Sequence, residues 1–266
     1  MKKGFTGQGL PATLRRKLGT LLTRLLADHA GYLHPVQVAG ETRINCALLQ
    51  DKPPLQYEVD GVSPLVTDDA IAEISDIFLK SAENGIGVLT GSIPPGVHRD
   101  VYGRLTQELR KHNARAVVDA QSSLLQEALP QHPYLIKPNR YELKLLCGAD
   151  ESFRKSRMSP ARHGRCTRKG SSTSAYRSER KAHSSSMIAV PYYVPSPQVE
   201  VISTVGAGDS MVAGLIFALM QGKESSDVLR FGVACGSATA TTPGTRIFTE
   251  PEARALMDQI SVERLK

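Results

Sequence analysis

Apolar and polar residues follow one another in a pattern that predicts alternating strands and helices along most of the chain. Short apolar runs predict strands, and apolar residues spaced three or four positions apart predict helices. The predicted strands cover 41–49, 55–59, 86–89, 116–118, 134–136 and 199–201, and the predicted helices cover 67–82, 101–112, 141–147 and 211–220. A Pro-Pro turn joins the first two strands into a hairpin. Such strand–helix–strand units favour an α/β fold with a mostly parallel sheet.

Polar motifs come directly after several of these strands. They are Gly91-Ser92, Asp119, Lys137-Pro138-Asn139 and the loop from Gly206 to Asp209. In a parallel sheet the ligand binds at the carboxyl ends of the strands. We therefore expect these motifs to lie along one edge of the sheet.

The loop from Thr204 to Ser210 places two glycines and a carboxylate ahead of an apolar helix. Backbone N–H groups in such a loop, together with the positive end of the helix, attract an anion. Asp209 beside them is positioned to accept a proton, which favours phosphoryl transfer. The alternative is an ordinary glycine turn in which Asp209 caps the helix.

Three other groups also have two interpretations. Asn139 and Glu142 have the spacing of a capping box, but they would also suit a hydrated Mg²⁺ with Lys137 near a phosphate. Arg43 is either a solvated charge at a strand edge or a bidentate ligand for a substrate phosphate. Gly244-Thr245-Arg246 is either a turn with a surface charge or part of a cation pocket beside the Gly206 loop.

Most of the positive charge belongs to a single segment. Residues 152–186 contain ten Lys or Arg, ten Ser and one acidic residue, so this segment carries +9 of a chain whose net charge is +7. The rest of the chain is therefore weakly acidic, which argues against a nucleic-acid-binding face spread over the fold.

The cysteines and the apolar runs indicate a cytoplasmic protein. The four cysteines are far apart and form no Cys-x-x-Cys pair, so neither disulfides nor a zinc site is expected. No apolar run reaches the ~18 residues of a membrane span. Residues 1–27 hold six Lys or Arg and no acid, and an amphipathic helix along the leucines of 14–26 accounts for this composition better than a targeting peptide.

Six strings of the sequence resemble the ribokinase-like carbohydrate kinases of the phosphofructokinase B type. They are GETRIN (40–45), TGSIPPGV (90–97), VVDAQSS (117–123), LIKPNRYEL (135–143), STVGAGDSM (203–211) and RFGVACGSATATTPGTR (230–246). This resemblance implies a three-layer α/β/α fold with a mostly parallel central sheet. It implies one kinase domain over residues 1–266, with 41–60 as the remnant of a β lid that often pairs between subunits.

The resemblance also implies a role for each matching residue. Asp209 would be the catalytic base, and the N–H groups of Gly206, Ala207 and Gly208 would hold the transferred phosphoryl group. Arg43 and Ser92 would contact the sugar phosphate. The remaining sets would be Lys137, Asn139, Val233 and Ser237 for ATP, Glu142 and Asn139 for Mg²⁺ through water, and Ser203, Val205, Gly244 and Arg246 for K⁺.

Two regions depart from the family pattern. Residues 1–18 have no counterpart, and the family's first strand and its sugar-binding Gly-Gly-x-x-x-Asn motif are missing, so we expect an N-terminally incomplete kinase. Residues 152–186 replace a strand and an ATP-binding glycine loop. Back-translation of 174–186 in a shifted frame restores a family-like strand and loop, so we hypothesise two compensating frameshifts. The Ser- and Arg-rich segment is expected to be disordered.

The sequence is compatible with three functions. The first is ATP-dependent phosphorylation of fructose 6-phosphate to fructose 1,6-bisphosphate, with tagatose 6-phosphate or fructose 1-phosphate as alternative substrates. The second is a catalytically impaired or inactive remnant of such a kinase. The third, nucleic-acid binding through 152–186, is disfavoured because that segment lacks aromatic residues interleaved with its basic ones. A homodimer through the lid is expected, and neither a nucleic acid nor a membrane is an expected partner.

Overall fold

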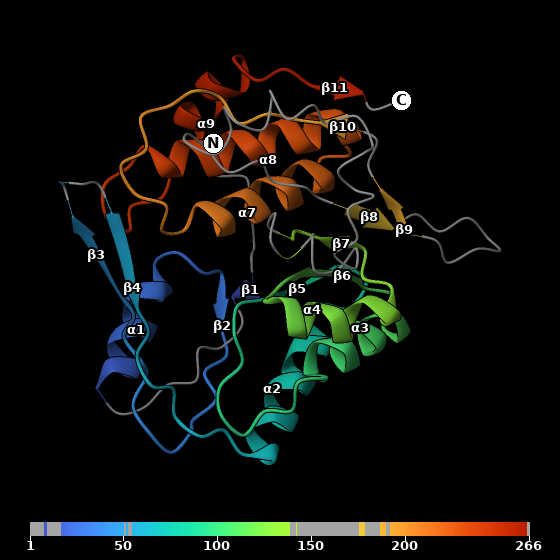
Figure 1. Ribbon diagram of the computed structural model, residues 1–266. Coiled ribbons are helices and arrows are strands. Elements are labelled where there is room, and N and C mark those ends of the chain that lie inside the picture. The colour runs from blue at the N-terminus through green and yellow to red at the C-terminus, as the bar shows by residue number, and fades with distance from the viewer. Residues whose placement is uncertain are drawn as a thin grey trace. The chain divides into compact units, whose positions relative to one another are not determined.

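The protein divides into two compact units in this computed structural model, which describes residues 8–9, 17–50, 52, 55–138, 142, 176–178, 187–189 and 192–264 (Figure 1). Unit 1 comprises residues 1–117 and 123–131, and unit 2 comprises 118–122 and 132–266. Helices and parallel strands follow one another along the chain, which confirms the predicted α/β class.

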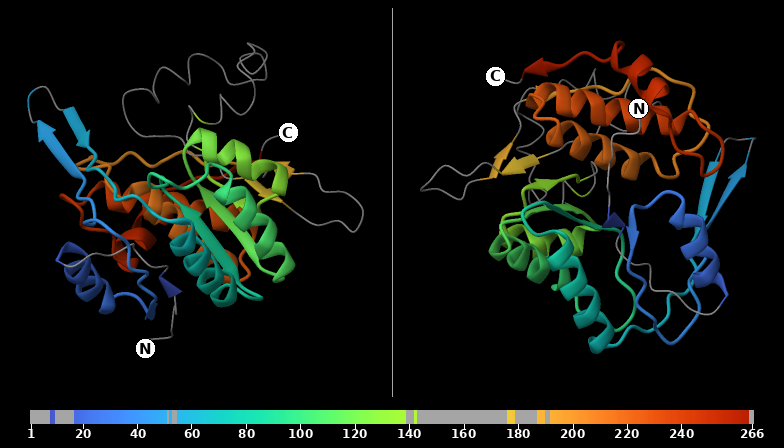
Figure 2. Two further views of the ribbon diagram at one scale, coloured as in Figure 1. Left: turned by 90° about the horizontal axis from the view of Figure 1, so that it is seen from below. Right: turned by 180° about the vertical axis from the view of Figure 1, so that it is seen from behind.

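Unit 1 contains most of the predicted strand–helix repeats. Its elements are β1 (Gln8–Gly9), α1 (Leu18–Ala27), β2 (Tyr32–Leu33), β3 (Cys46–Gln50), β4 (Leu55–Val59), α2 (Asp68–Ser81), β5 (Ile86–Thr90), α3 (Val101–Lys111), the start of β6 (Arg115–Asp119), α4 (Ser122–Ala128) and the 3₁₀ turn η1 (Leu129–Gln131). Helices α2, α3 and α4 lie on one face of β5 and β6 (Figures 1 and 2).

Local signals explain where the elements of unit 1 begin and how they pack. The Thr67 side chain accepts a hydrogen bond from the Ala70 N–H at 3.3 Å, so Thr67, the first residue of the predicted helix 67–82, is the N-cap of α2. Gly87 in β5 packs so closely that a Cβ there would lie 2.7–2.8 Å from side-chain atoms of Leu109 and Phe78. The sheet and its two helices therefore approach each other closely at a position where only glycine fits.

The predicted hairpin is present as the antiparallel pair β3–β4, shorter at its start than the sequence predicts. Residues 41–45 are not strand, and pairing runs from Cys46 opposite Val59 to Gln50 opposite Leu55. Residues directly opposite in an antiparallel pair share a face, and every second residue of a strand points to the same face. The opposed residues Leu48 and Tyr57 therefore lie on one face with the two end pairs, Cys46–Val59 and Gln50–Leu55. That face is apolar and exposed, with Leu48 58% and Tyr57 51% exposed.

Unit 2 begins at the end of β6 and contains the C-terminal helices. Its further elements are β7 (Leu135–Ile136), β8 (Tyr176–Ser178), β9 (Met187–Ala189), β10 (Tyr192–Tyr193), α7 (Ala207–Met220), α8 (Ser225–Ala240), α9 (Glu250–Met257) and β11 (Glu263–Arg264). The sheet continues from β6 to β7, then β8 and β9, and the last two pairings are antiparallel. Of the basic segment 152–186 only β8 is described, so its expected disorder stays a prediction.

Helices α7 and α8 lie side by side in unit 2, with α9 next to α8 (Figures 1 and 2). Glycines allow this approach, because a Cβ on Gly214 would lie 2.7 Å from Cys235 Sγ, and one on Gly236 would lie 2.9 Å from the Ala207 carbonyl oxygen. The start of α7 is therefore held against α8 by direct backbone contact.

The strand predicted at 199–201 is absent, and the helix predicted at 141–147 lies mostly outside the described residues. The predicted strand 199–201 is wrong: these residues are not in a strand, and the next residue, Ile202, donates its N–H to the Ala240 carbonyl at 2.9 Å. The segment therefore runs along a helix end, where Val201 stays 47% exposed, instead of joining a sheet. Of the predicted helix 141–147 only Glu142, which is helical, lies within the described residues. In the described ranges no helix is both long and apolar enough to cross a membrane.

Candidate functional site

The loop before α7 presents free backbone N–H groups at a helix N-terminus. Gly206 is the N-cap residue and has a φ of 75°, a conformation that glycine adopts without strain. The Ala207 N–H donates to the Thr204 carbonyl at 3.2 Å, whereas the N–H groups of Gly206 and Gly208 donate to no acceptor among the described residues. Such a group of N–H donors at the positive end of a helix is suited to bind an anion.

Asp209 lies in the first turn of α7 and is exposed. Because Gly206 occupies the N-cap and no side chain caps the helix, the interpretation of Asp209 as the helix cap is wrong. Its carboxylate forms no ion pair with any residue that the structure describes. An exposed, unpaired carboxylate next to free N–H donors can accept a proton from a group held at the same anion site.

Lys137 brings a positive charge to this loop from β7. The Lys137 residue is buried, its Nζ lies 3.1 Å from Asp119 Oδ1, and a Cβ built on Gly208 would lie 3.6 Å from the same Nζ. The structure thus brings the predicted ATP-binding lysine against the predicted anion loop, within unit 2. A buried ammonium needs a counter-charge, and Asp119 supplies it.

The carboxylates near Lys137 influence one another. Burial raises the pKa of Asp119 above its ordinary value, and the Lys137 ammonium opposes this shift. The negative charges of Asp209 and Glu142 raise the pKa of Asp119 further, so both carboxylates lie close enough to Asp119 to repel its negative charge. Glu142, predicted for Mg²⁺, is therefore close enough to interact with this cluster, whereas Asn139 lies outside the described residues.

Arg43 in unit 1 is held by two hydroxyl groups. Its Nη2 donates to Ser92 Oγ at 2.9 Å and its Nη1 donates to Ser63 Oγ at 3.2 Å. The structure therefore brings together the two residues predicted to contact the sugar phosphate. In the described part of the chain Arg43 forms no ion pair, so its guanidinium retains an unbalanced charge that suits an anionic ligand.

The residues predicted for K⁺ come from two loops that meet in unit 2. Ser203 Oγ donates to the Gly244 carbonyl at 3.0 Å and accepts from the Val205 N–H at 3.3 Å. Arg246 follows in the same turn, and its carbonyl accepts a hydrogen bond from Thr242 Oγ1. The Ser203 hydroxyl and the Gly244 carbonyl thus meet between the two loops, and carbonyl oxygens are groups that coordinate K⁺ in proteins.

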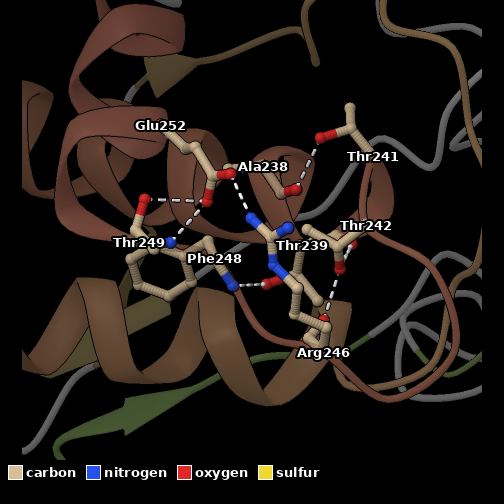
Figure 3. Close-up of polar contacts among 8 residues, drawn as sticks. All are labelled: Ala238, Thr239, Thr241, Thr242, Arg246, Phe248, Thr249 and Glu252. Atoms are coloured by element: carbon tan, nitrogen blue, oxygen red, sulfur yellow. Dashed lines mark hydrogen bonds and ion pairs between the residues drawn. The ribbon is translucent and has the colours of Figure 1, made fainter.

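A polar network at the ends of α8 and α9 fixes the second of these loops (Figure 3). Glu252 accepts from the N–H and the hydroxyl of Thr249 at 2.7 and 2.8 Å, and it also pairs with Arg246. These bonds lower the pKa of Glu252, the Thr249 N–H contributing most. Thr239 Oγ1 accepts the Phe248 N–H at 3.2 Å, which anchors the loop to α8.

Thr239 also connects this loop with α7. Its hydroxyl donates to Ser210 Oγ at 2.8 Å, both side chains are buried, and Ser210 directly follows Asp209. Val233 and Ser237, predicted for the adenine, lie one turn apart on α8 and are buried as well.

The sequence placed Asp119 at the expected ligand-binding edge without a specific role, and it assigned no role to Thr239 or Glu252. The signal for Glu252 was readable, because Thr249-x-x-Glu252 with a proline between them is a capping-box pattern. An acidic residue at the end of a buried strand pointed to Asp119, but its partner Lys137 could not be chosen from spacing alone. No sequence pattern identified Thr239.

The chain belongs to the pfkB family of carbohydrate kinases, whose family description matches residues 17–253. It is therefore a sugar kinase by family, with a ribokinase-like α/β fold.

Individual relatives act on fructose phosphates. The chain is 28% identical to the 1-phosphofructokinase of Bacillus subtilis (strain 168) over 271 residues, covering 98% of this chain and 80% of the relative. It is also 28% identical to the ATP-dependent 6-phosphofructokinase isozyme 2 of Escherichia coli (strain K12), covering 91% and 79%. A crystal structure of phosphofructokinase-2 from Escherichia coli in complex with potassium superposes with a TM-score of 0.73 at 26% identity, covering 92% of this chain and 80% of that one.

Proposed function

We propose that this protein transfers a phosphoryl group from ATP to fructose 6-phosphate, forming fructose 1,6-bisphosphate. The observation that carries the proposal is the group at the start of α7: the Lys137 ammonium together with N–H donors and an Asp209 carboxylate that have no partner among the described residues. Phosphoryl transfer depends mainly on positioning and on stabilising charge, and this group offers both. Kinship to an ATP-dependent 6-phosphofructokinase supports the choice of substrates.

The predicted residues then have distinct roles. The Arg43 guanidinium and the Ser92 hydroxyl bind the phosphate that the sugar already carries. Lys137 and the N–H groups of Gly206 and Gly208 bind the phosphate being transferred. The Ala207 N–H joins them when it leaves the Thr204 carbonyl, to which it donates in the structure. Asp209 accepts the proton of the attacking hydroxyl. Val233 and Ser237 of α8 line the adenine site.

Fructose 1-phosphate is the second candidate substrate, because one relative is a 1-phosphofructokinase. Both sugars present a phosphate dianion to Arg43 and a free primary hydroxyl for transfer, so the described residues suit either. Tagatose 6-phosphate differs from fructose 6-phosphate only in the configuration of one hydroxyl and is the third sugar to test.

Two cations suit residues of unit 2. Mg²⁺ prefers one or two carboxylates, retained waters and the phosphates of its nucleotide, and Glu142 beside the Asp119–Lys137 pair provides such a carboxylate, with Asn139 as the second predicted residue. When bound, Mg²⁺ would neutralise phosphate charge. K⁺ is proposed to bind where Ser203, Val205 and Gly244 meet, with the Gly244 carbonyl and the Ser203 hydroxyl as oxygen ligands, and a potassium complex of a related enzyme supports this.

We also propose that the apolar face of β3–β4 pairs with the same face of a second copy in a homodimer. Cys46, Leu48, Leu55, Tyr57 and Val59 share this face, and every one of them is exposed. An exposed apolar patch of this kind marks an interaction surface. The free thiols of Cys46 and Cys235 agree with the proposed cytoplasmic location.

The test is a coupled kinase assay with MgATP and each of the three sugar phosphates, run on the wild type and on Asp209→Asn. We expect turnover with fructose 6-phosphate and a fall in kcat of about 10²–10⁴-fold in the variant, the range for loss of a general base. Asp227→Asn is the matched control, because Asp227 lies in the first turn of α8 as Asp209 does in α7.

The control separates catalysis from helix stability. Either substitution removes a favourable charge at a helix N-terminus, worth about 0.3–1 kcal/mol, so the two should destabilise alike and only Asp209→Asn should lose activity. Binding of MgATP without turnover of any of the three sugars would favour the catalytically impaired kinase instead.

A further inference from the structure

Asp119 and Lys137 form an ion pair at the carboxyl ends of neighbouring strands in unit 2. Asp119 ends β6 and Lys137 directly follows β7, and the Lys137 N–H donates to the Val118 carbonyl at 3.3 Å. The backbone therefore fixes the two residues opposite each other. The side chains of Lys137 and Asp119 are only 10% and 15% exposed, respectively, with 3.1 Å between Lys137 Nζ and Asp119 Oδ1.

The lysine has other carboxylates within electrostatic reach. It lies against Gly208, whose neighbour Asp209 acts on Asp119 together with Glu142. A lysine side chain is a flexible four-carbon stem with a compact charge, so without Asp119 the ammonium beside Gly208 would be able to turn towards Asp209, the next residue. If it paired with Asp209, the proposed base would be neutralised and the phosphate site would lose its positive charge at once.

We propose that Asp119 is a positioning residue, which holds the Lys137 ammonium beside Gly208 to meet a nucleotide phosphate and keeps it from pairing with Asp209. Asp119 itself contacts neither substrate nor the reacting atoms. The proposal rests on the proposed function, which makes Lys137 a ligand of the ATP phosphates. Its consequence is that Asp119 matters for nucleotide binding only while Lys137 is present.

The experiment is a double-mutant cycle on the full chain, read by calorimetric titration with MgATP in the absence of any sugar phosphate. We expect Asp119→Asn to raise the Kd of MgATP about tenfold, within the range of coupling between residues in contact. In a Lys137→Met background the same substitution should change the Kd by less than about twofold. Asp119→Glu retains the charge and should recover part of the affinity.

A matched control removes an equally charged but exposed pair. Glu250→Gln breaks the Glu250–Arg254 pair of α9, whose partners are 63% and 60% exposed, and should leave the Kd unchanged. An equal loss of affinity from Asp119→Asn in both backgrounds would overturn the proposal, since Asp119 would then act on the nucleotide or its metal directly. Unchanged binding by Asp119→Asn would overturn it as well.

Thermal unfolding covers the case in which Asp119→Asn folds poorly. Removing one partner of a buried pair leaves an unpaired charge, whereas removing both does not, so the double variant should melt above Asp119→Asn. A double variant no more stable than Asp119→Asn would contradict the pairing. Failure of the wild type to bind MgATP would instead refute the proposed function, and that result is read before any variant is made.

Discussion

Replacement of Gly206 by alanine tests whether the conformation of the anion loop is required for catalysis. Gly206 has a φ of 75°, yet a Cβ there would meet only Ile247 Cγ2 and Thr239 Cγ2, both at an ordinary 3.9 Å. The cost of Gly206→Ala is therefore backbone strain alone, about 1–2 kcal/mol for a left-handed alanine. For a chain of this size that corresponds to a fall in Tm of about 2–8 °C.

Gly222 at the other end of α7 is the matched control. It has a φ of 66° and open space where its Cβ would be, so Gly222→Ala should lower the free energy of unfolding by the same amount. Where the loop relaxes part of this strain, only Gly206→Ala should also displace the N–H groups at the anion site, and loss of such a donor lowers kcat by about 10²–10³-fold.

Urea unfolding and the coupled kinase assay measure the two effects separately. If Gly206→Ala loses stability but keeps the kcat of Gly222→Ala, the N–H groups of this loop do not stabilise the transferred phosphoryl group. If Gly206→Ala is as stable as the wild type, the strain argument itself is refuted.

Three further results are expected. Gly214→Ala should destabilise by about 1–3 kcal/mol in urea, because its Cβ would lie 2.7 Å from Cys235 Sγ; a neutral result would mean that α7 and α8 can move apart freely. Burial raises the pKa of Cys235 to about 12, so in the native protein iodoacetamide at pH 8 should alkylate the exposed Cys46 and spare Cys235, as peptide mass spectrometry would show; rapid labelling of Cys235 would contradict its burial. Leu48→Asp should dissociate the proposed dimer in sedimentation analysis, whereas Ala47→Asp on the opposite face of the hairpin should not; equal effects would place the interface elsewhere.

The regular elements could be predicted because their signals are local. The Thr67 cap, the apolar spacing of α2 and the strand 55–59 all appear within a few residues of sequence, and the structure has them where the pattern placed them. The strand predicted at 199–201 failed for a physical reason. Apolar composition alone does not show whether a neighbouring strand exists, and here the backbone bonds to the end of α8.

The candidate site was predicted in its residue types but not in its pairings. Arg43 and Ser92 were both named from the sequence, yet the bond between them joins residues 49 positions apart. The Thr239–Ser210 bond spans 29 positions between two helices. No periodicity or spacing rule predicts either hydrogen bond, because contacts between distant residues depend on the tertiary fold and not on the local sequence pattern.

The charge of the whole chain is a poor guide to the charge of the site. The net charge of +7 comes from residues 152–186, while the described groups near the anion loop are three carboxylates, Asp119, Glu142 and Asp209, and one ammonium, Lys137. Uncomplexed ATP would bring several more negative charges to a region that is already negative, and at these separations repulsion in a partly buried site is strong. Attraction must then come from the free N–H groups, from Lys137 held in place by Asp119, and from a divalent cation that enters with the nucleotide. Among the described residues, three carboxylates around one lysine thus lead us to expect that ATP, in the proposed function, binds as its magnesium complex.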